Sequence, residues 1–313
     1  MKGLEISKKY YEEYGAAMIH EQFPEYEGII ACGLAGSGSE CFGFDDELSR
    51  DHDFEPGFCI WIPEENVIGS KDAFRLERAY SKLPKEYQGL KKQLMNHIGG
   101  ARHGVMRVSE FLEKKLGRKK LSLDMSDWLN IPEQSFAEIV NGEIWRDDSG
   151  LIAGIRQQLS YMPEDIRLKK LAGCLAMMGQ SGCYNYPRCM GHGESGAAQL
   201  ALCEFVKYAM HAIFLLNMEY MPYYKWSFRA LRNLGLLGEL ADPFEMLISS
   251  DNSPDIYEAK RDAVDSISHE IIETLKLLEL TAQSCDDLGR HADSINNMIQ
   301  DNNLRNADIL LAV

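Results

Sequence analysis

The chain lacks an excess of positive charge. Its 313 residues include 33 Lys and Arg against 48 Asp and Glu, which gives a formal net charge of −15. Because contacts to the phosphates of duplex nucleic acid need clustered Lys and Arg, this balance disfavours a duplex nucleic acid as partner. A small anionic ligand that is carried in with a divalent cation remains compatible with it.

Long apolar runs and a regular cysteine pattern are also missing. Charged residues such as Lys207 and Glu219 interrupt the longest apolar runs before they reach the roughly 20 residues that cross a bilayer, so we expect no membrane partner. The eight cysteines are scattered in hydrophobic contexts with no signal peptide ahead of them, which predicts reduced thiols and a cytoplasmic protein. The tightest group, Cys183, Cys189 and His192, lacks the second ligand pair of a zinc site.

Alternating strand and helix patterns occupy the first half of the chain. The apolar periodicity predicts strands over 29–34, 58–62 and 104–109, and helices over 6–22, 73–83, 88–97 and 110–116. Residues 145–150 read as a turn at the edge of the sheet. This alternation predicts an α+β fold, with a mixed sheet and flanking helices in a first domain over residues 1–150.

Helical periodicity dominates the second half. The pattern predicts long helices over 157–180, 194–219, 224–238 and 255–285. In the second of these, Leu200, Cys203 and Val206 lie along one face, as in the core of a bundle. We therefore expect an all-α helical bundle as a second domain, residues 151–313.

A turn of small residues follows the strand predicted at 29–34. Gly36, Ser37, Gly38 and Ser39 allow backbone N–H groups to approach phosphate oxygens closely. The nearest competing phosphate motifs fit less well, because no Gly-Lys-Ser/Thr follows and the third glycine of the dinucleotide motif is missing. The turn is therefore interpreted as a phosphate cradle.

Two aspartates precede the strand predicted at 58–62. Asp51 and Asp53 are two residues apart, so on an extended chain both carboxylates point to the same side. Magnesium typically takes one or two protein carboxylates and completes its octahedron with water and phosphate oxygens. Such a pair alone is usually a turn or a cap, but its position about 14 residues after the small-residue turn favours a magnesium site.

A third carboxylate is harder to find. The strand over Val105–Val108 offers no acid, and Glu110 is the nearest candidate, with Glu40 and Asp46 as substitutes. Glu110 is explained equally well as an acid in the first turn of a helix, where the helix dipole favours negative charge.

One lysine in the helical half is a candidate anion contact. Lys225 lies among Tyr223, Tyr224 and Trp226, aromatic side chains that offer a stacking surface for a base or an acceptor. The same cluster is explained equally well as packing that closes the bundle.

The segment from Gly36 to Asp53 resembles the glycine-serine and paired-aspartate motif of the nucleotidyltransferase superfamily. Residues 43–53, GFDDELSRDHD, are similar to a bacterial family of unknown function labelled DUF4037. Four further segments share this similarity: 127–129, 142–150, 161–165 and 222–226. The resemblance implies an N-terminal nucleotidyltransferase fold followed by a helical bundle, as in small-molecule adenylyltransferases that modify aminoglycosides. It also implies that Ser37 contacts the nucleotide phosphates and that Asp51 and Asp53 hold magnesium.

The expected function is a magnesium-dependent nucleotidyltransferase that moves a nucleoside monophosphate, AMP from ATP, to a hydroxyl of a small molecule. The expected catalytic residues are Asp51, Asp53 and Glu110, the first two as metal ligands, and the nucleotide-binding residues are Gly36, Ser37, Gly38, Ser39 and Lys225. Two alternatives stay open: a catalytically inactive nucleotide-binding regulatory module, and a transferase that acts on a protein or an RNA end. The acceptor, the base preference and the oligomeric state do not follow from the sequence.

Overall fold

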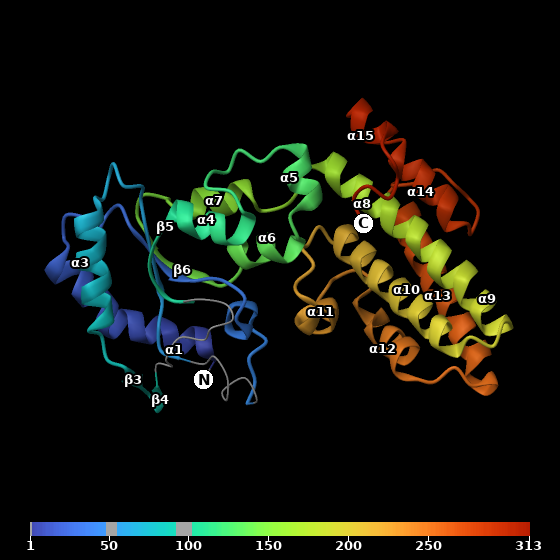
Figure 1. Ribbon diagram of the computed structural model, residues 1–313, viewed down its shortest axis with the longest axis horizontal. Helices are drawn as coiled ribbons and strands as arrows, with labels where there is room; N and C mark the ends of the chain where they lie inside the picture. The colour runs from blue at the N-terminus through green and yellow to red at the C-terminus, as the bar shows by residue number, and fades with distance from the viewer. Residues whose placement is uncertain (1, 48–54, 92–101) are drawn as a thin grey trace. The chain divides into compact units, whose positions relative to one another are not determined.

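The computed structural model describes residues 2–47, 55–91 and 102–313, which form two compact units (Figure 1). The first unit, Met1–Leu123 with Ile131–Ser160, contains the sheet, and the second, Asp124–Asn130 with Tyr161–Val313, is helical. The expected α+β fold is confirmed, because a mixed four-strand sheet with helices is followed by a largely helical region.

The four-strand sheet has the order β5-β2-β1-β6. β1 (Ala31–Leu34) pairs antiparallel with β2 (Cys59–Ile62) and with β6 (Glu143–Asp147), and β5 (Gly104–Arg107) runs parallel to β2. In the register of the central pair, Gly33 lies opposite Cys59. The connection from residue 35 to residue 58 therefore leaves and re-enters the sheet at the same end.

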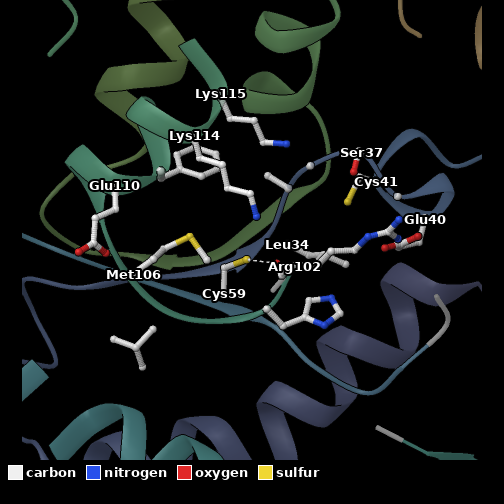
Figure 2. Close-up of a pocket in the computed structure, with 16 residues that line it drawn as sticks. Leu34, Ser37, Glu40, Cys41, Cys59, Arg102, Met106, Glu110, Lys114 and Lys115 are labelled. Carbon is white, nitrogen blue, oxygen red and sulfur yellow. Dashed lines mark hydrogen bonds between the residues drawn. The ribbon is translucent and has the colours of Figure 1, made fainter. Parts of the chain in front are cut away.

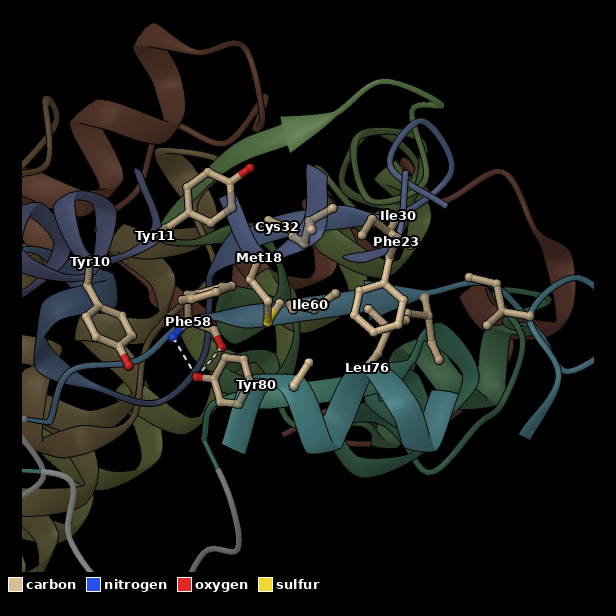
Figure 3. Packing of buried hydrophobic residues seen from close by; sticks show 14 residues of the cluster. Tyr10, Tyr11, Met18, Phe23, Ile30, Cys32, Phe58, Ile60, Leu76 and Tyr80 are labelled. Atoms are coloured by element: carbon tan, nitrogen blue, oxygen red, sulfur yellow. Dashed lines mark hydrogen bonds between the residues drawn. The ribbon is translucent and has the colours of Figure 1, made fainter. Parts of the chain in front are cut away.

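One face of the sheet is covered by α1 (Gly3–Tyr10), α2 (Ala16–Gln22) and α3 (Ser70–Ser81). A π-helical turn, Tyr11–Gly15, joins the first two helices. The helix predicted over 6–22 therefore contains a π-helical segment, and it begins three residues earlier than predicted, at Gly3. Figure 3 shows Phe58 and Ile60 packed among the side chains of this face. The Tyr80 hydroxyl accepts a hydrogen bond from the Phe58 N–H and donates one to the Phe58 carbonyl, at 3.0 and 2.9 Å. This buried contact fixes α3 beside the start of β2.

The opposite face carries α4 (Val108–Leu116) and α6 (Glu133–Val140), which pack against each other. Because side chains alternate along a strand, Cys59 and Trp61 point to this face when Ile60 points to the other. Trp61 packs edge to face on Phe111 of α4, with ring centroids 5.6 Å apart. All three of these strand residues are buried, so β2 is covered on both faces.

A two-strand hairpin replaces part of a predicted helix. β3 (Glu86–Tyr87) pairs with β4 (Leu90–Lys91), so the helix predicted over 88–97 is wrong at its start. Gln88 and Gly89 both have positive φ angles, 50° and 81°, and two such residues in succession form a tight hairpin turn. Residues 92–97 lie outside the described residues.

β6 occupies much of the segment predicted as a turn. Arg146 and Asp147 pair with β1, and Trp145 stacks on Tyr11 at a centroid distance of 5.6 Å. These long-range contacts outweigh the local turn signal of the polar residues that follow. The Asp147 carboxylate accepts hydrogen bonds from the N–H groups of residues 151, 152 and 153. The last of these residues begins α7 (Ala153–Gln158).

The helical unit is built around two long helices, α8 (Glu164–Met178) and α10 (Ser195–Leu216), which pack against each other. The remaining helices are α5 (Met125–Asn130), α9 (Tyr186–Gly191), α11 (Tyr224–Leu231), α12 (Ala241–Ser249), α13 (Pro254–Leu277), α14 (Leu288–Asn296) and α15 (Asn302–Asn306). The helix predicted over 157–180 is interrupted around Pro163, which stands at the N-cap of α8 because proline cannot occupy a helix interior.

α10 is long and apolar enough to cross a membrane by length and composition alone, contrary to the expectation that charges break every such run. Its charges are paired, since Lys207 Nζ lies 3.6 Å from a Glu204 carboxylate oxygen. Of its apolar window, 61% is buried inside the structure, as in the core helix of a bundle.

Candidate functional site

A cavity of about 270 Å³ lies in the sheet unit, at the end of the sheet where β1 stops. Its walls come from the turn after β1, the start of β2, β5 with the two residues before it, and α4 (Figure 2). The volume is close to the lower end, roughly 300 Å³, of pockets that bind small molecules. The lining residues are Leu34, Ala35, Gly36, Ser37, Gly38, Glu40, Cys41, Cys59, Arg102, His103, Val105, Met106, Glu110, Phe111, Lys114 and Lys115.

The small-residue turn forms one wall of this cavity. Gly36 has a φ of +141°, a conformation that residues with a side chain rarely adopt, and a Cβ built there would lie 3.8 Å from Lys115 Nζ. A Cβ on Gly38 would overlap the Glu40 carboxylate. Within the described part of the chain, no group accepts a hydrogen bond from the backbone N–H of Ser37 or Gly38. Both N–H groups are therefore left for water or a ligand.

Two lysines of α4 enter the cavity from the opposite wall. Phe111, Lys114 and Lys115 are spaced by three and four residues and so share one face of the helix, the face that packs on the sheet. Figure 2 shows the ends of both lysine side chains directed into the space between α4 and the turn. Docking of Phe111 on Trp61 therefore also directs two ammonium groups towards the turn.

The two ammonium groups differ in their surroundings. Lys115 forms an ion pair with Glu138 of α6, and both side chains are largely buried. Burial lowers the pKa of Lys114, and the nearby Lys115 ammonium lowers it further. A bound anion would relieve both effects, because it would supply negative charge inside the cavity.

Arg102 and His103 add two more nitrogen-bearing side chains just before β5. The His103 side chain is only 4% exposed, and its Nδ1 lies 3.4 Å from a Glu55 carboxylate oxygen without the alignment of a hydrogen bond. Figure 2 shows the Arg102 side chain extended towards Glu40. The cavity thus gathers three fixed cations against two carboxylates, those of Glu40 and Glu110, in a chain that is acidic as a whole.

Two thiols line the cavity but are poorly suited as nucleophiles. Burial raises the pKa of Cys59 to about 12 and that of Cys41 well above its ordinary value. The thiolate is the reactive form of cysteine, and at neutral pH both groups hold their protons. The chemistry of this cavity therefore falls to its cations, its carboxylates and its backbone N–H groups.

The structure brings four of the predicted site residues to one cavity. Gly36, Ser37, Gly38 and Glu110 all line it, whereas Ser39 begins the short 3₁₀ helix Ser39–Phe42 and is not among the lining residues. One Glu110 carboxylate oxygen accepts a hydrogen bond from the Arg107 N–H at 3.0 Å. Glu110 thus caps α4 in this structure while standing at the edge of the cavity.

The remaining predicted residues lie elsewhere. Asp51 and Asp53, predicted as catalytic metal ligands, fall outside the described residues. Lys225 lies in the helical unit, on α11, where its Nζ stands 4.8 Å from the centroid of the Trp226 ring. The roles assigned to all three residues stay predictions.

Sequence reasoning missed the lysines of α4. The sequence places Lys114 and Lys115 in the last turn of the helix predicted at 110–116, where lysine is favoured by the helix dipole and needs no functional explanation. Their spacing from Phe111 was the available signal, because a lysine on the apolar face of a helix is expensive to bury without an anionic partner.

Other candidate metal ligands do not form a cluster. Across residues 2–47, 55–91 and 102–313, no three His, Cys, Asp or Glu side chains come close enough together to hold a metal ion. Cys183, Cys189 and His192 are among the side chains that do not form such a group. All eight cysteines carry free thiols.

Comparison with known proteins identifies one domain. No curated protein and no solved structure matches the chain. Residues 128–227 match a family model described as "Domain of unknown function (DUF4037)". The match contains the similar segments at 142–150, 161–165 and 222–226 and excludes 43–53. The chain therefore carries a DUF4037 domain at residues 128–227, which begins in α5, passes through α6 and β6, and ends in α11.

Proposed function

We propose that the protein is a magnesium-dependent nucleotidyltransferase that transfers a nucleoside monophosphate, AMP from ATP, to a hydroxyl of a small molecule. The observation that carries the proposal is the cavity in which the turn Gly36–Gly38 faces Lys114 and Lys115. On one wall stand backbone N–H groups that have no acceptor among the described residues, and on the other stand ammonium groups. These are the two kinds of donor that bind phosphate oxygens.

The position of the paired aspartates along the chain supports a metal site beside this cavity. Asp51 and Asp53 belong in sequence to the connection from residue 35 to residue 58, which leaves and re-enters the sheet at the end where the turn lies. Two carboxylates suffice as the protein's share of a magnesium site, so these residues would hold the ion. Bound magnesium would supply positive charge against the phosphates during transfer.

In this proposal each wall of the cavity has a separate task. The N–H groups of Ser37 and Gly38 orient phosphate oxygens, and Lys114 and Lys115 offset their charge from the opposite side. The acceptor hydroxyl then attacks the α-phosphorus in line, and it loses its proton to water as pyrophosphate leaves. Holding both reactants in this geometry lowers the entropic part of the barrier.

A second candidate is a module that binds nucleotide without transferring it. Glu110 favours this alternative, because its carboxylate caps α4 through the Arg107 N–H, and the residues of β5 include no acid. The other carboxylate that lines the cavity is that of Glu40. If neither Glu110 nor Glu40 serves as the third carboxylate, the site would bind magnesium and ATP without turnover.

The test is to incubate the protein with magnesium, labelled ATP and a panel of small-molecule alcohols, aminoglycosides included, and to measure pyrophosphate release. We expect Asp51→Asn and Asp53→Asn to abolish release. Lys114→Met should weaken ATP binding about tenfold or more, the usual effect of losing one charge-assisted hydrogen bond. Lys119→Met is the matched control, because Lys119 is exposed, pairs with Glu113 and lies outside the cavity. ATP binding without release on any acceptor would select the second candidate, and no ATP binding would refute both.

A further inference from the structure

The turn Gly36–Gly38 is held by a residue from far along the chain. Asn141 follows the last residue of α6, and its amide makes two hydrogen bonds to the same glycine. Its Oδ1 accepts the Gly36 N–H at 3.0 Å, and its Nδ2 donates to the Gly36 carbonyl at 2.7 Å. Gly36 lies beyond the end of β1. The Asn141 side chain therefore makes with Gly36 the two hydrogen bonds that the backbone of a neighbouring strand would otherwise make.

The backbone of Asn141 is anchored independently of this contact. Its N–H donates to the Ala137 carbonyl at 3.0 Å, which closes the last turn of α6, and its carbonyl accepts a hydrogen bond from Arg156. The next residue, Gly142, donates its N–H to the Cys41 carbonyl at 2.9 Å. The amide of Asn141 is therefore presented to Gly36 from a fixed position.

The same end of α6 also reaches the opposite wall of the cavity. Glu138 is three residues before Asn141, on the same face of the helix, and forms the ion pair with Lys115. Lys115 Nζ in turn lies near Gly36, on the side where a side chain would stand. Neither Glu138 nor Asn141 is a lining residue, yet one helix end contacts both walls.

We infer that Asn141 is a positioning residue for phosphate binding. By taking both polar groups of Gly36, it holds the positive φ of this glycine. The N–H groups of Ser37 and Gly38, which no acceptor in the described part of the chain takes up, are then the donors that the turn offers to a ligand. This inference rests on the proposed nucleotide site and deepens it, because it assigns a task in that site to the matched domain at residues 128–227. That domain would contribute the support of the phosphate cradle, although the cradle itself precedes it in sequence.

The test measures binding of inorganic pyrophosphate by calorimetry, with and without magnesium, at a temperature where each variant is fully folded. Asn141→Ala removes both hydrogen bonds and should weaken binding about tenfold, because two neutral hydrogen bonds together contribute on the order of this factor. Asn141→Ser, a smaller polar change, serves if the alanine variant does not fold. Hydrogen exchange at the Gly36 amide should accelerate in either variant.

Tyr80→Phe is the matched control, because it removes two buried hydrogen bonds, as Asn141→Ala does, but on the other face of the sheet, and it should leave pyrophosphate affinity unchanged. The inference is overturned if Asn141→Ala binds pyrophosphate within about twofold of the wild type, less than the loss of one hydrogen bond. It is also overturned if Tyr80→Phe weakens binding equally. A wild type that binds no pyrophosphate overturns this inference together with the nucleotide site, whereas one that binds pyrophosphate but never releases it from ATP overturns only the transfer.

Discussion

Gly142 offers a sharp test of how the turn is supported. Its φ is +65°, and a Cβ built there would overlap the Leu34 carbonyl oxygen and lie 3.2 Å from the Ala35 Cα. Gly150 has a similar φ of +71°, but its Cβ would meet no atom within 4 Å. Both Gly→Ala substitutions therefore carry the same cost of a left-handed residue, about 1 kcal/mol, but only the one at 142 also forces backbone to move.

The two substitutions should differ in how much they lower the free energy of unfolding. Gly150→Ala should destabilise the sheet unit by about 1 kcal/mol. Gly142→Ala should cost a further 1 to 3 kcal/mol, roughly the range for overpacking at a site that cannot relax freely. Because the displaced atoms belong to Leu34 and Ala35, directly before the turn, Gly142→Ala should also weaken pyrophosphate binding, while Gly150→Ala should not.

Hydrogen exchange at the amides of β1 and β2 is the suitable assay, since it reports the stability of the sheet unit separately from that of the helical unit. Calorimetry on the same two variants gives the affinities. If Gly142→Ala proves no more destabilising than Gly150→Ala, the close approach of residue 142 to the end of β1 does not matter for stability.

Two further predictions concern charge. Asp147→Ala should destabilise the sheet unit by about 3 kcal/mol, because three N–H groups lose their acceptor, whereas loss of the exposed Asp148 partner of Arg146 should cost less than about 1 kcal/mol. Hydrogen exchange at β6 measures both, and equal effects would contradict the capping role of Asp147. Pyrophosphate affinity should fall as pH rises, beginning below the pH at which an exposed lysine deprotonates, because the pKa of Lys114 is lowered and the anion binds its charged form. Calorimetry over a pH series checks this, and a pH dependence that is unchanged in Lys114→Met would refute it.

Local sequence patterns were sufficient to predict β1, β2 and the turn at 36–38, which form part of the cavity wall. The apolar run at 29–34 and the alternation at 58–62 predict β1 and β2 because burial on a sheet dictates residue type position by position. The small residues at 36–38 predict a turn because glycine adopts positive φ angles at little steric cost, and Gly36 has such an angle in the structure.

Long-range contacts explain what the sequence did not predict. Asn141 and Gly36 are 105 residues apart, and nothing near either residue indicates the other. The strand character of Arg146 likewise depends on pairing with β1, and the polar sequence around it is that of a turn. The role proposed for Lys114 depends on the packing of Phe111 on Trp61, which fixes the direction of α4.

The hydrogen bonds of Asn141 bear on the chemical lifetime of the protein. Asparagine followed by glycine is the dipeptide most prone to deamidation, because the unhindered glycine nitrogen attacks the side-chain amide carbon and ammonia leaves. Water then opens the resulting cyclic imide to aspartate or isoaspartate. Here that nitrogen is held by the Cys41 carbonyl and the amide is held by Gly36, so the folded sheet unit restrains both reacting groups. Each local unfolding of this region releases them, and the resulting aspartate or isoaspartate would lack the side-chain N–H that the Gly36 carbonyl accepts. Mass spectrometry of aged protein should therefore show conversion of Asn141 accelerating under partly denaturing conditions, and phosphate binding would decline irreversibly with it.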